Sequence, residues 1–384
     1  MMTFKKTVRA CIRRGIKAAV LIAVILTFAL SALPASGADW PMFLKDKSHS
    51  PSVSKAPSLP LSLKWQYKTG GPVYSSPVVS DGKLFVGSYD GFLYALDVSS
   101  GELLWRFETG GEILSTPAVS GGRVYFGSKD RNVYAVSAAS GEQVWKYKTR
   151  GKVLTSPVVF GGTVFIASND NFLYMLEAES GVRIARKELK DYTKYSGIYS
   201  SPVVSGDAVF IASKNRAIYS LSQDNGAKNW EYTTKSAIYA SPVINGVTLY
   251  VASYDRVLYA INVEDGKMKW RRKLGDWAYA SPVVSGNWVY QGLKNGDLAT
   301  FDKDTGSRGI TLTLPDEINS TPVVTDDGIA FVGCEDGVLY AIDVNESAIS
   351  WEYQTGAGIH SSPAVTGGMV YVGSKDGVIY AFGE

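Results

Sequence analysis

One short pattern recurs eight times along the chain and constrains its fold more than any other feature. A Ser-Pro or Thr-Pro pair opens each copy, and successive prolines lie 40, 40, 45, 40, 40, 40 and 41 residues apart. These prolines are Pro77, Pro117, Pro157, Pro202, Pro242, Pro282, Pro322 and Pro363. Self-similarity at about 40 residues is typical of a repeat architecture, in which each unit buries its apolar faces against its neighbours. The repeats allow 384 residues to form one domain, although a chain of this length usually exceeds a single compact core.

Each copy predicts four short β-strands. In the first full copy these are residues 76–80, 83–87, 92–96 and 103–107, which are rich in β-branched and aromatic residues in alternating positions. The turns between them are Asp81-Gly82, Asp90-Gly91 and Ser100-Gly101. Four strands in a unit of about 40 residues, repeated eight times, predict an all-β fold, an eight-bladed β-propeller of four-stranded blades.

The last copy lacks one strand, and the start of the repeat region supplies it. The eighth copy has no Gly-x-x-x-Trp strand after residues 380–384. Trp65 lies 12 residues before Pro77, as Trp105 lies 12 residues before Pro117. We therefore expect residues 61–68 to pair as the outer strand of the last blade, which closes the ring and covers two strand edges.

Tryptophan recurs at one position of the fourth strand in six copies. These residues are Trp65, Trp105, Trp145, Trp230, Trp270 and Trp351, whereas copies three and six have Ala185 and Ile310. The regular spacing favours packing between blades over stacking on a ligand. Cys334 is the one cysteine beyond residue 38 and stands where other copies have serine, so we expect a structural role and no intrachain disulfide.

The first 38 residues have the features of a secretory signal. A basic start leads into an apolar run from Ala18 to Leu33, and Ser36 and Ala38 suit a signal-peptidase site before Asp39. The apolar run is shorter than the roughly 20 residues that span a membrane, which favours cleavage over the alternative of a retained anchor. We expect residues 1–38 to be a signal peptide, residues 39–60 a lead-in and linker, and residues 61–384 the propeller.

The signal also accounts for the positive net charge. It holds six of the 39 Lys and Arg and none of the 36 Asp and Glu, so the remainder carries about −3 instead of the +3 of the whole chain. This balance gives no electrostatic case for nucleic-acid binding. No cysteine follows the apolar run directly, and we therefore expect no lipoprotein anchor. A twin-arginine signal at Arg13-Arg14 is a weaker alternative, because the residues after it match that pattern poorly.

The segment from Ala95 to Trp105 reads Ala-x-Asp-x-x-Ser-Gly-x-x-x-Trp. It resembles the tryptophan-docking motif of the pyrroloquinoline-quinone (PQQ) repeat propellers. The copies that begin at Ala135 and Ala260 match most positions, while the copy that ends at Trp351 has Ser347 where glycine is expected. The resemblance covers about residues 61–384 and implies the fold. It implies no single function, because the family contains quinoprotein dehydrogenases, the outer-membrane assembly factor BamB and many secreted propellers.

The dehydrogenase chemistry of that family does not transfer onto particular residues here. Its alcohol dehydrogenases place a vicinal Cys-Cys disulfide over PQQ and bind Ca²⁺, and this chain has no such cysteine pair. With only His49 and His360, no histidine metal cluster is evident. The aspartates recur at the second turn of most copies, which predicts turn hydrogen bonds: Asp90, Asp130, Asp170, Asp255, Asp336 and Asp376. We expect no catalytic residue and no metal.

Propeller topology predicts which residues line the mouth of the channel. The position three before each proline marks the entry to the first strand near the central channel, on the same face as the second turn. It is occupied by Tyr74, Leu114, Leu154, Tyr199, Tyr239, Tyr279, Asn319 and His360. This position varies although its flanks repeat, and it is aromatic or polar in six copies, which suits a mouth lined for binding. Packing of the tyrosines against neighbouring strands is the other interpretation.

The longer step between copies three and four falls on the same face, in residues 187–196. It brings Tyr192 and Tyr195 as candidate contact residues, although a plain exposed insertion is the other interpretation. Cations near the second turns predict a mixed-charge rim around the mouth: Lys129, Arg131, Lys214, Arg216, Arg256, Lys294 and Lys375.

These features together predict an exported, non-catalytic β-propeller of the cell envelope, similar to BamB. We expect it to be a monomer in the periplasm or outside the cell, with no membrane span after signal cleavage and no nucleic-acid partner. It would bind envelope or secreted proteins through the mouth face and the blade edges, without a cofactor. The alternative is a small quinoprotein oxidoreductase that uses PQQ and Ca²⁺.

Overall fold

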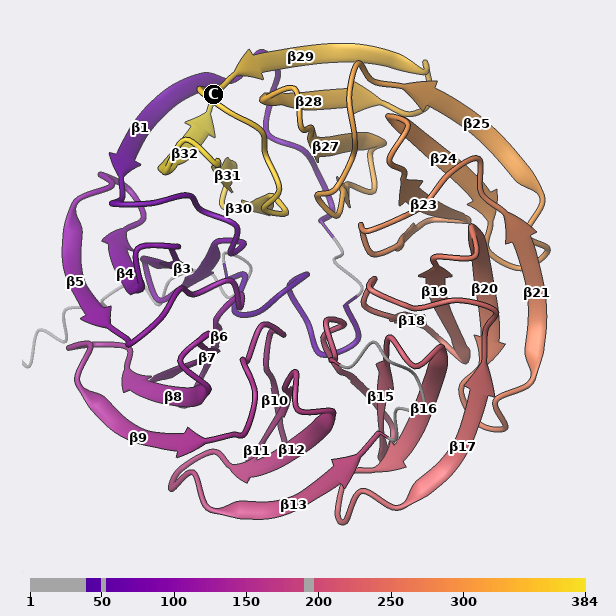
Figure 1. Cartoon of the computed structure of the whole chain (residues 1–384). Helices are drawn as coiled ribbons and strands as arrows, with labels where there is room; N and C mark the ends of the chain where they lie inside the picture. Colours follow the sequence, from indigo (N-terminus) through magenta and orange to yellow (C-terminus); the bar gives the residue numbers. More distant parts are fainter. Residues whose placement is uncertain (1–38, 50–52, 190–196) are drawn as a thin grey trace, which may run out of the picture. The chain divides into compact units, whose positions relative to one another are not determined.

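The computed structural model describes residues 39–49, 53–189 and 197–384. Within these residues, 32 strands form eight four-stranded antiparallel sheets. The sheets stand around a central channel as the blades of a propeller (Figure 1). The all-β, eight-bladed prediction is therefore confirmed. No helix in the described residues combines the length and the apolarity that a membrane span needs.

The first four blades each consist of four consecutive strands that run from the channel outward (Figure 1). Blade 1 contains β2 (Val78–Ser80), β3 (Lys83–Gly87), β4 (Phe92–Asp97) and β5 (Leu103–Glu108). Blade 2 contains β6 (Ala118–Ser120), β7 (Arg123–Gly127), β8 (Asn132–Ser137) and β9 (Gln143–Lys148). Blade 3 contains β10 (Val158–Phe160), β11 (Thr163–Ala167), β12 (Phe172–Glu177) and β13 (Arg183–Glu188). Blade 4 contains β14 (Val203–Ser205), β15 (Ala208–Ala212), β16 (Ala217–Ser222) and β17 (Lys228–Thr233).

The remaining blades follow the same order, except that the last one takes its outer strand from the start of the repeats. Blade 5 contains β18 (Val243–Asn245), β19 (Thr248–Ser253), β20 (Val257–Asn262) and β21 (Met268–Lys273). Blade 6 contains β22 (Val283–Ser285), β23 (Trp288–Gly292), β24 (Asp297–Asp302) and β25 (Arg308–Thr313). Blade 7 contains β26 (Val323–Val324), β27 (Ile329–Gly333), β28 (Val338–Asp343) and β29 (Ala348–Gln354). Blade 8 contains β30 (Ala364–Thr366), β31 (Met369–Gly373), β32 (Val378–Gly383) and β1 (Ser62–Lys68).

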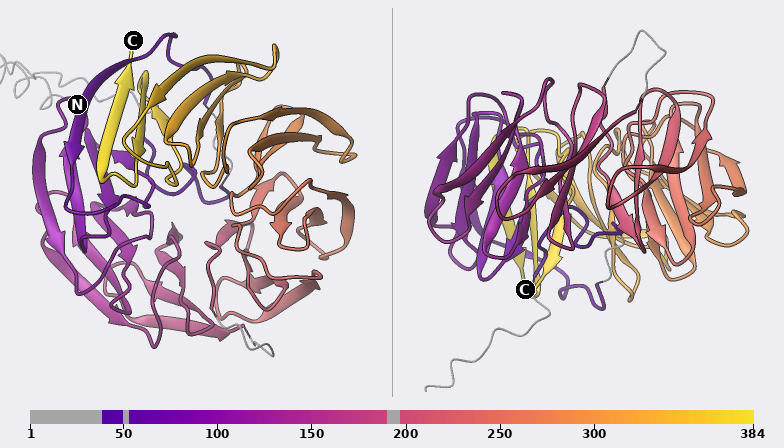
Figure 2. Two further views of the ribbon diagram at one scale, coloured as in Figure 1. Left: turned by 45° about the horizontal axis from the view of Figure 1, so that its top comes forward. Right: turned by 90° about the horizontal axis from the view of Figure 1, so that it is seen from below.

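Strand β1 closes the ring, as the sequence predicts. It pairs antiparallel with β32, from Ser62 opposite Gly383 to Lys68 opposite Val378. Figures 1 and 2 show the two strands side by side where the first and last repeats meet. The pairing satisfies backbone groups that would otherwise form an open sheet edge on β32.

The six repeated tryptophans each join one blade to the next. The indole Nε1 of Trp65 donates to the carbonyl oxygen of Val98 at 3.0 Å, and that of Trp351 donates to Leu61 O at 3.0 Å. The other four pairs are Trp105 with Ala138, Trp145 with Ala178, Trp230 with Val263 and Trp270 with Lys303. A turn glycine makes room for each of these rings except Trp351, since a Cβ on Gly101 would lie 2.6 Å from the Trp65 ring.

The apolar core lies between adjacent blades. The middle strands of each blade are almost wholly buried, whereas the outer strands alternate exposed and partly buried residues. In five blades a glycine ends the second strand and packs against the segment that enters the next blade. A Cβ on Gly373 of blade 8 would lie 2.3 Å from Cγ1 of Val73, which precedes blade 1. Only glycine therefore allows this approach without a shift of the neighbouring segment.

Residues 39–49 of the lead-in cross the channel beside the innermost strands. Trp40 forms a β-bridge with Val79 in blade 1. The N–H of Val204 in blade 4 donates to Lys47 O at 2.7 Å, and the N–H of Ile244 in blade 5 donates to Ser48 O at 2.9 Å. In Figure 1 this indigo segment lies inside the ring. The lead-in thus satisfies backbone groups on the free inner edges of several blades.

Candidate functional site

Eight side chains from one repeat position surround a single cavity at the channel mouth. The cavity has a volume of about 220 Å³, and these residues line it: Tyr74, Leu114, Leu154, Tyr199, Tyr239, Tyr279, Asn319 and His360. The structure therefore brings together all of the candidate residues at the entries to the first strands. The two other candidates, Tyr192 and Tyr195, lie outside the described residues.

Two residues farther along each copy, just before the first strand, eight hydroxyl groups link the blades into a closed ring. The residue before each repeat proline is Ser or Thr, and its backbone N–H donates to the hydroxyl of the equivalent residue in the next blade at 2.8–3.1 Å. The ring runs through Ser76, Thr116, Ser156, Ser201, Ser241, Ser281, Thr321 and Ser362. A residue before proline is held extended, and its buried N–H needs an acceptor. The same hydroxyl-bearing residues line the cavity.

Phe43 of the lead-in also lines the cavity. Its ring makes an edge contact with His49, with 5.1 Å between the ring centroids. The Nδ1 atom of His49 lies 3.2 Å from the carbonyl oxygen of Pro242. Complete burial lowers the pKa of His49 to about 3, although the contact with Pro242 opposes this shift. A neutral imidazole therefore supports Phe43 at neutral pH.

Blades 4, 5 and 6 present an aromatic wall to the cavity. The ring centroid of Tyr239 lies 5.4 Å from that of Tyr199 and 5.5 Å from that of Tyr279. Tyr254 contacts Tyr239 at 4.7 Å and Tyr279 at 5.2 Å, and the plane of Trp277 is within 5° of the Tyr254 plane. Tyr199, Trp277 and Tyr279 are 39%, 42% and 37% exposed, so the wall offers aromatic surface to solvent.

Two lysines lie over this aromatic wall. The Nζ atom of Lys214 is 5.2 Å from the ring centroid of Tyr199, and that of Lys294 is 5.5 Å from the centroid of Tyr279. Burial, together with the neighbouring Tyr279 hydroxyl, raises the pKa of Tyr254, so this phenol stays protonated at neutral pH. Aromatic faces beside ammonium groups suit a ligand that has both apolar and anionic parts.

A polar cluster around Glu335 occupies the side of the mouth formed by blades 7 and 8. Its carboxylate accepts a hydrogen bond from Asn319 at 3.1 Å, contacts His360 Nδ1 at 3.2 Å and pairs with Lys375 at 2.5 Å. Burial acts to raise the pKa of Glu335, but the contacts with His360, Lys375 and Asn319 outweigh it and lower the pKa to about 2. Glu335 is therefore ionised at neutral pH and holds these three side chains in place.

Sequence reasoning missed three residues of this site, Tyr254, Trp277 and Glu335. Tyr254 and Glu335 occupy the same repeat position, directly before the aspartate of the second turn. This position could have been identified in the same way as that of Tyr239, because its residue varies between copies while the neighbouring residues repeat. Trp277 lies two residues before Tyr279 in the connection between blades 5 and 6.

The repeated aspartates act within their turns, as the sequence predicts. Asp90 Oδ1 accepts the N–H of Phe92 at 3.0 Å, while Oδ2 accepts the N–H of Gly70 at 2.7 Å and the hydroxyl of Tyr94 at 2.6 Å. The same three bonds recur at Asp376 with Val378, Gly356 and Tyr380. In the part of the chain that the structure describes, no group of three or more His, Cys, Asp or Glu side chains is placed to hold a metal ion.

Comparison with protein families identifies β-propellers over most of the chain. The family described as the beta-alanine-activating enzyme β-propeller matches residues 47–287, more than half of the sequence. The family described as outer membrane protein assembly factor BamB matches residues 294–384. No curated protein matches the sequence.

Solved structures share the fold at low sequence identity. BamB from Moraxella catarrhalis is 16% identical with a TM-score of 0.74, over 85% of this chain and 100% of that chain. A europium-containing methanol dehydrogenase is 13% identical with a TM-score of 0.79, over 90% of this chain and 98% of that chain. The quinohemoprotein alcohol dehydrogenase from Comamonas testosteroni is 16% identical with a TM-score of 0.78, over 90% and 81% of the two chains. Similarity at this level concerns the fold alone.

Proposed function

The chain belongs to the family described as the beta-alanine-activating enzyme β-propeller, and its repeats are of the PQQ type. From this premise we propose that it is an exported, non-catalytic binding protein of the cell envelope. It binds an envelope or secreted protein at the mouth of the channel, as a monomeric scaffold similar to BamB. Residues 1–38 direct it to the periplasm or the cell exterior. Its partner is a protein and not a nucleic acid.

The observation that carries this proposal is the arrangement of side chains around the mouth cavity. An aromatic wall of Tyr199, Tyr239 and Tyr279 and the Glu335 cluster both adjoin one cavity of about 220 Å³. This volume is below the roughly 300–1,000 Å³ of typical small-molecule pockets, so it suits one or two side chains of a partner. Partly exposed tyrosine and tryptophan around such a pocket supply the contacts that dominate many protein interfaces.

The polar side chains around the cavity already form hydrogen bonds within the protein, which favours a binding function over catalysis. The ring hydroxyls accept backbone N–H bonds from the neighbouring blades, and Ser76 is one example. Glu335 is committed to Asn319, His360 and Lys375. Among the described residues that line the cavity, no nucleophile therefore stands beside an available base.

Crosslinking in an envelope extract tests the proposal. Wild-type protein should retain a specific partner, and the double change Tyr239→Ala with Tyr279→Ala should abolish that retention. Trp288→Ala is the matched control, because Trp288 is 39% exposed but starts β23 at the opposite end of the blade. Equal capture by wild type and by the Tyr239 and Tyr279 variant would overturn the mouth as the binding site.

The alternative is a quinoprotein oxidoreductase that uses PQQ and Ca²⁺. Aromatic faces beside lysines favour a flat anionic ligand such as PQQ. The described residues do not fit the calcium ion, which prefers several free oxygen ligands, because Glu335 is already bound to three donors. Titration with PQQ and Ca²⁺, followed by thermal shift and dye reduction, distinguishes the two functions. A saturable shift with dye reduction would replace the binding proposal with the enzyme.

A further inference from the structure

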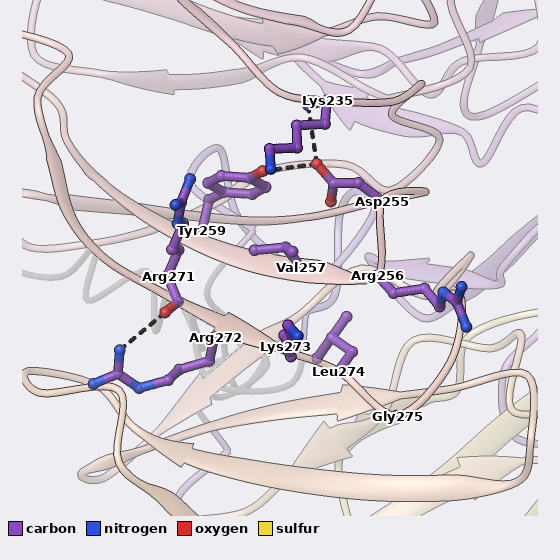
Figure 3. A pocket seen from close by; sticks show the side chains of 10 residues that line it. All are labelled: Lys235, Asp255, Arg256, Val257, Tyr259, Arg271, Arg272, Lys273, Leu274 and Gly275. Atoms are coloured by element: carbon purple, nitrogen blue, oxygen red, sulfur yellow. Dashed lines mark hydrogen bonds between the residues drawn. The ribbon is translucent and has the colours of Figure 1, made fainter.

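A second candidate site lies on the outer half of blade 5 and shares no lining residue with the mouth cavity. It is a hollow of about 530 Å³ lined by five cationic side chains, which we name the basic groove: Lys235, Arg256, Arg271, Arg272 and Lys273. Val257, Tyr259 and Leu274 lie between them. Figure 3 shows Arg271 and Arg256 on opposite sides of this hollow, with Lys273 between them and Lys235 at the top of the view.

The strand register explains why these cations gather. In the antiparallel pair of β20 and β21, Arg271 lies opposite Tyr259 and Lys273 lies opposite Val257. Residues that are directly paired or two apart point to the same face of a sheet, so Arg271 and Lys273 share one face. Lys235 and Arg256 come from two connections at the end of the blade, the first after β17 and the second before β20.

Cations outnumber carboxylates in the lining of the basic groove by five to one. Asp255 is the one carboxylate in its lining, and its Oδ2 accepts the backbone N–H of Lys235 at 2.9 Å and the Tyr259 hydroxyl at 2.7 Å. None of the ion pairs among the described residues includes any of the five cations. Arg272 donates to the carbonyl oxygen of Thr305 at 2.8 Å, which leaves Lys235, Arg256, Arg271 and Lys273 to face a ligand.

Comparison among the repeats shows that the turn does not require Arg256. It has a φ of 61°, a left-handed conformation that favours glycine. Four other blades have glycine there, namely Gly91, Gly296, Gly337 and Gly377 with φ of 80–88°. Blade 1 has Gly70, Gly91, Arg106 and Glu108 at the four positions that are Lys235, Arg256, Arg271 and Lys273 in blade 5.

Blades 2 and 4 also have arginine at this turn position, Arg131 and Arg216 with φ of 75° and 76°, so the strained backbone alone does not single out Arg256. What distinguishes Arg256 is its place in the lining of the basic groove. Charges on an outer strand also protect a sheet edge from pairing, and this explains Arg271 and Lys273. It does not explain Lys235 and Arg256, which lie in connections and not on the edge strand. Edge protection alone therefore does not account for Lys235 and Arg256.

We propose that the basic groove binds a phosphate ester on a body about the size of a monosaccharide. A planar guanidinium group such as that of Arg256 or Arg271 fits phosphate oxygens through paired hydrogen bonds, and the other cations of the basic groove add charge to match a dianion. The hollow of about 530 Å³ exceeds the size of a phosphate ion and lies within the roughly 300–1,000 Å³ of small-ligand pockets. Free sugar phosphates and phospholipid headgroups both carry this chemistry. The inference does not depend on what the mouth binds.

Calorimetric titration with glucose 6-phosphate, inorganic phosphate and glucose tests the ligand class. Glucose 6-phosphate should bind saturably, inorganic phosphate more weakly and glucose not at all. Sedimentation with phosphatidylcholine vesicles, with and without phosphatidic acid, separates the two sources. Binding to the free ester alone assigns a soluble ligand, and binding to phosphatidic acid vesicles assigns a headgroup. Binding of neither would overturn the proposal.

The variant Arg256→Gly keeps the test independent of folding. It relieves the strained turn, so its melting temperature should stay equal or rise while affinity for the bound ester falls on the order of tenfold. Arg131→Gly is the matched control, because Arg131 has the same turn position in blade 2 with a φ of 75°. Lys273→Gln should weaken binding as well. Unchanged affinity in both Arg256→Gly and Lys273→Gln would contradict the proposal.

Discussion

The backbone N–H of Ser362 donates a 2.9 Å hydrogen bond to the hydroxyl of Ser76, 286 residues earlier in the chain. This bond completes the ring of eight hydroxyls, just as the pairing of β1 with β32 completes the outer wall. The propeller is therefore closed twice, at the channel and at its circumference. Both closures join the first repeat to the last, which no segment of the chain connects directly.

The change Ser76→Ala should destabilise the protein by about 1–3 kcal/mol, because it leaves the buried N–H of Ser362 without an acceptor. Urea unfolding followed by tryptophan fluorescence measures this loss. Ser58→Ala is the control, since Ser58 is exposed. Equal unfolding midpoints for the two variants would mean that the hydroxyl ring contributes nothing to stability.

Trp65→Ala should lower the free energy of unfolding by about 3–5 kcal/mol, because it leaves a cavity between blades 8 and 1 and removes the hydrogen bond to Val98. Trp288→Ala, at an exposed position, should change stability far less. Thermal unfolding of the two variants makes the comparison. A similar melting temperature for both would contradict the role of Trp65 in closing the ring.

Stability should fall as the pH is lowered below about 6.5, the ordinary pKa of histidine, because His49 stays neutral when folded and gains a proton when unfolded. Stability continues to fall until the pH reaches about 3, the pKa of His49 in the folded protein, where the folded state also takes up the proton. The loss in the free energy of unfolding approaches about 1.4 kcal/mol for each pH unit below 6.5.

His49→Asn should remove this part of the dependence, since asparagine tolerates the positive φ of 57° at this position. Unfolding measured between pH 6.5 and 5 isolates the contribution of His49 to the pH dependence of stability. Glu335 does not interfere in this range, because its pKa is lowered to about 2 and its stabilising contribution is lost only at lower pH. Identical pH profiles for wild type and variant would show that His49 is not the group responsible.

Cys334 should resist alkylation in the folded protein, because burial raises the pKa of its thiol to about 12 and shields the sulfur from reagent. Iodoacetamide treatment at pH 8, with the Cys334 peptide followed by mass spectrometry, measures the rate. Labelling should accelerate when urea unfolds the chain. Rapid labelling without urea would disprove the buried position.

The candidate site was only partly predictable from the sequence. The residues from Tyr74 to His360 were found because propeller topology turns one repeat position into one ring. Glu335 was not found, because its importance comes from three side chains of two neighbouring blades that meet only in the folded ring. The basic groove was missed for the same reason, although its residue Arg256 was noted in the rim.

The sequence by itself determined the strands, the turns, the number of blades and the closing strand. Those features follow from alternation and turn residues within about ten positions, where the backbone preferences of each residue act locally. Asp81-Gly82, for example, predicts a hairpin turn and has the required positive φ at both residues. Only the tertiary structure decided which side chains share a cavity. Contacts such as Ser362 with Ser76 depend on the curvature that eight packed blades produce together, and no local segment encodes that curvature.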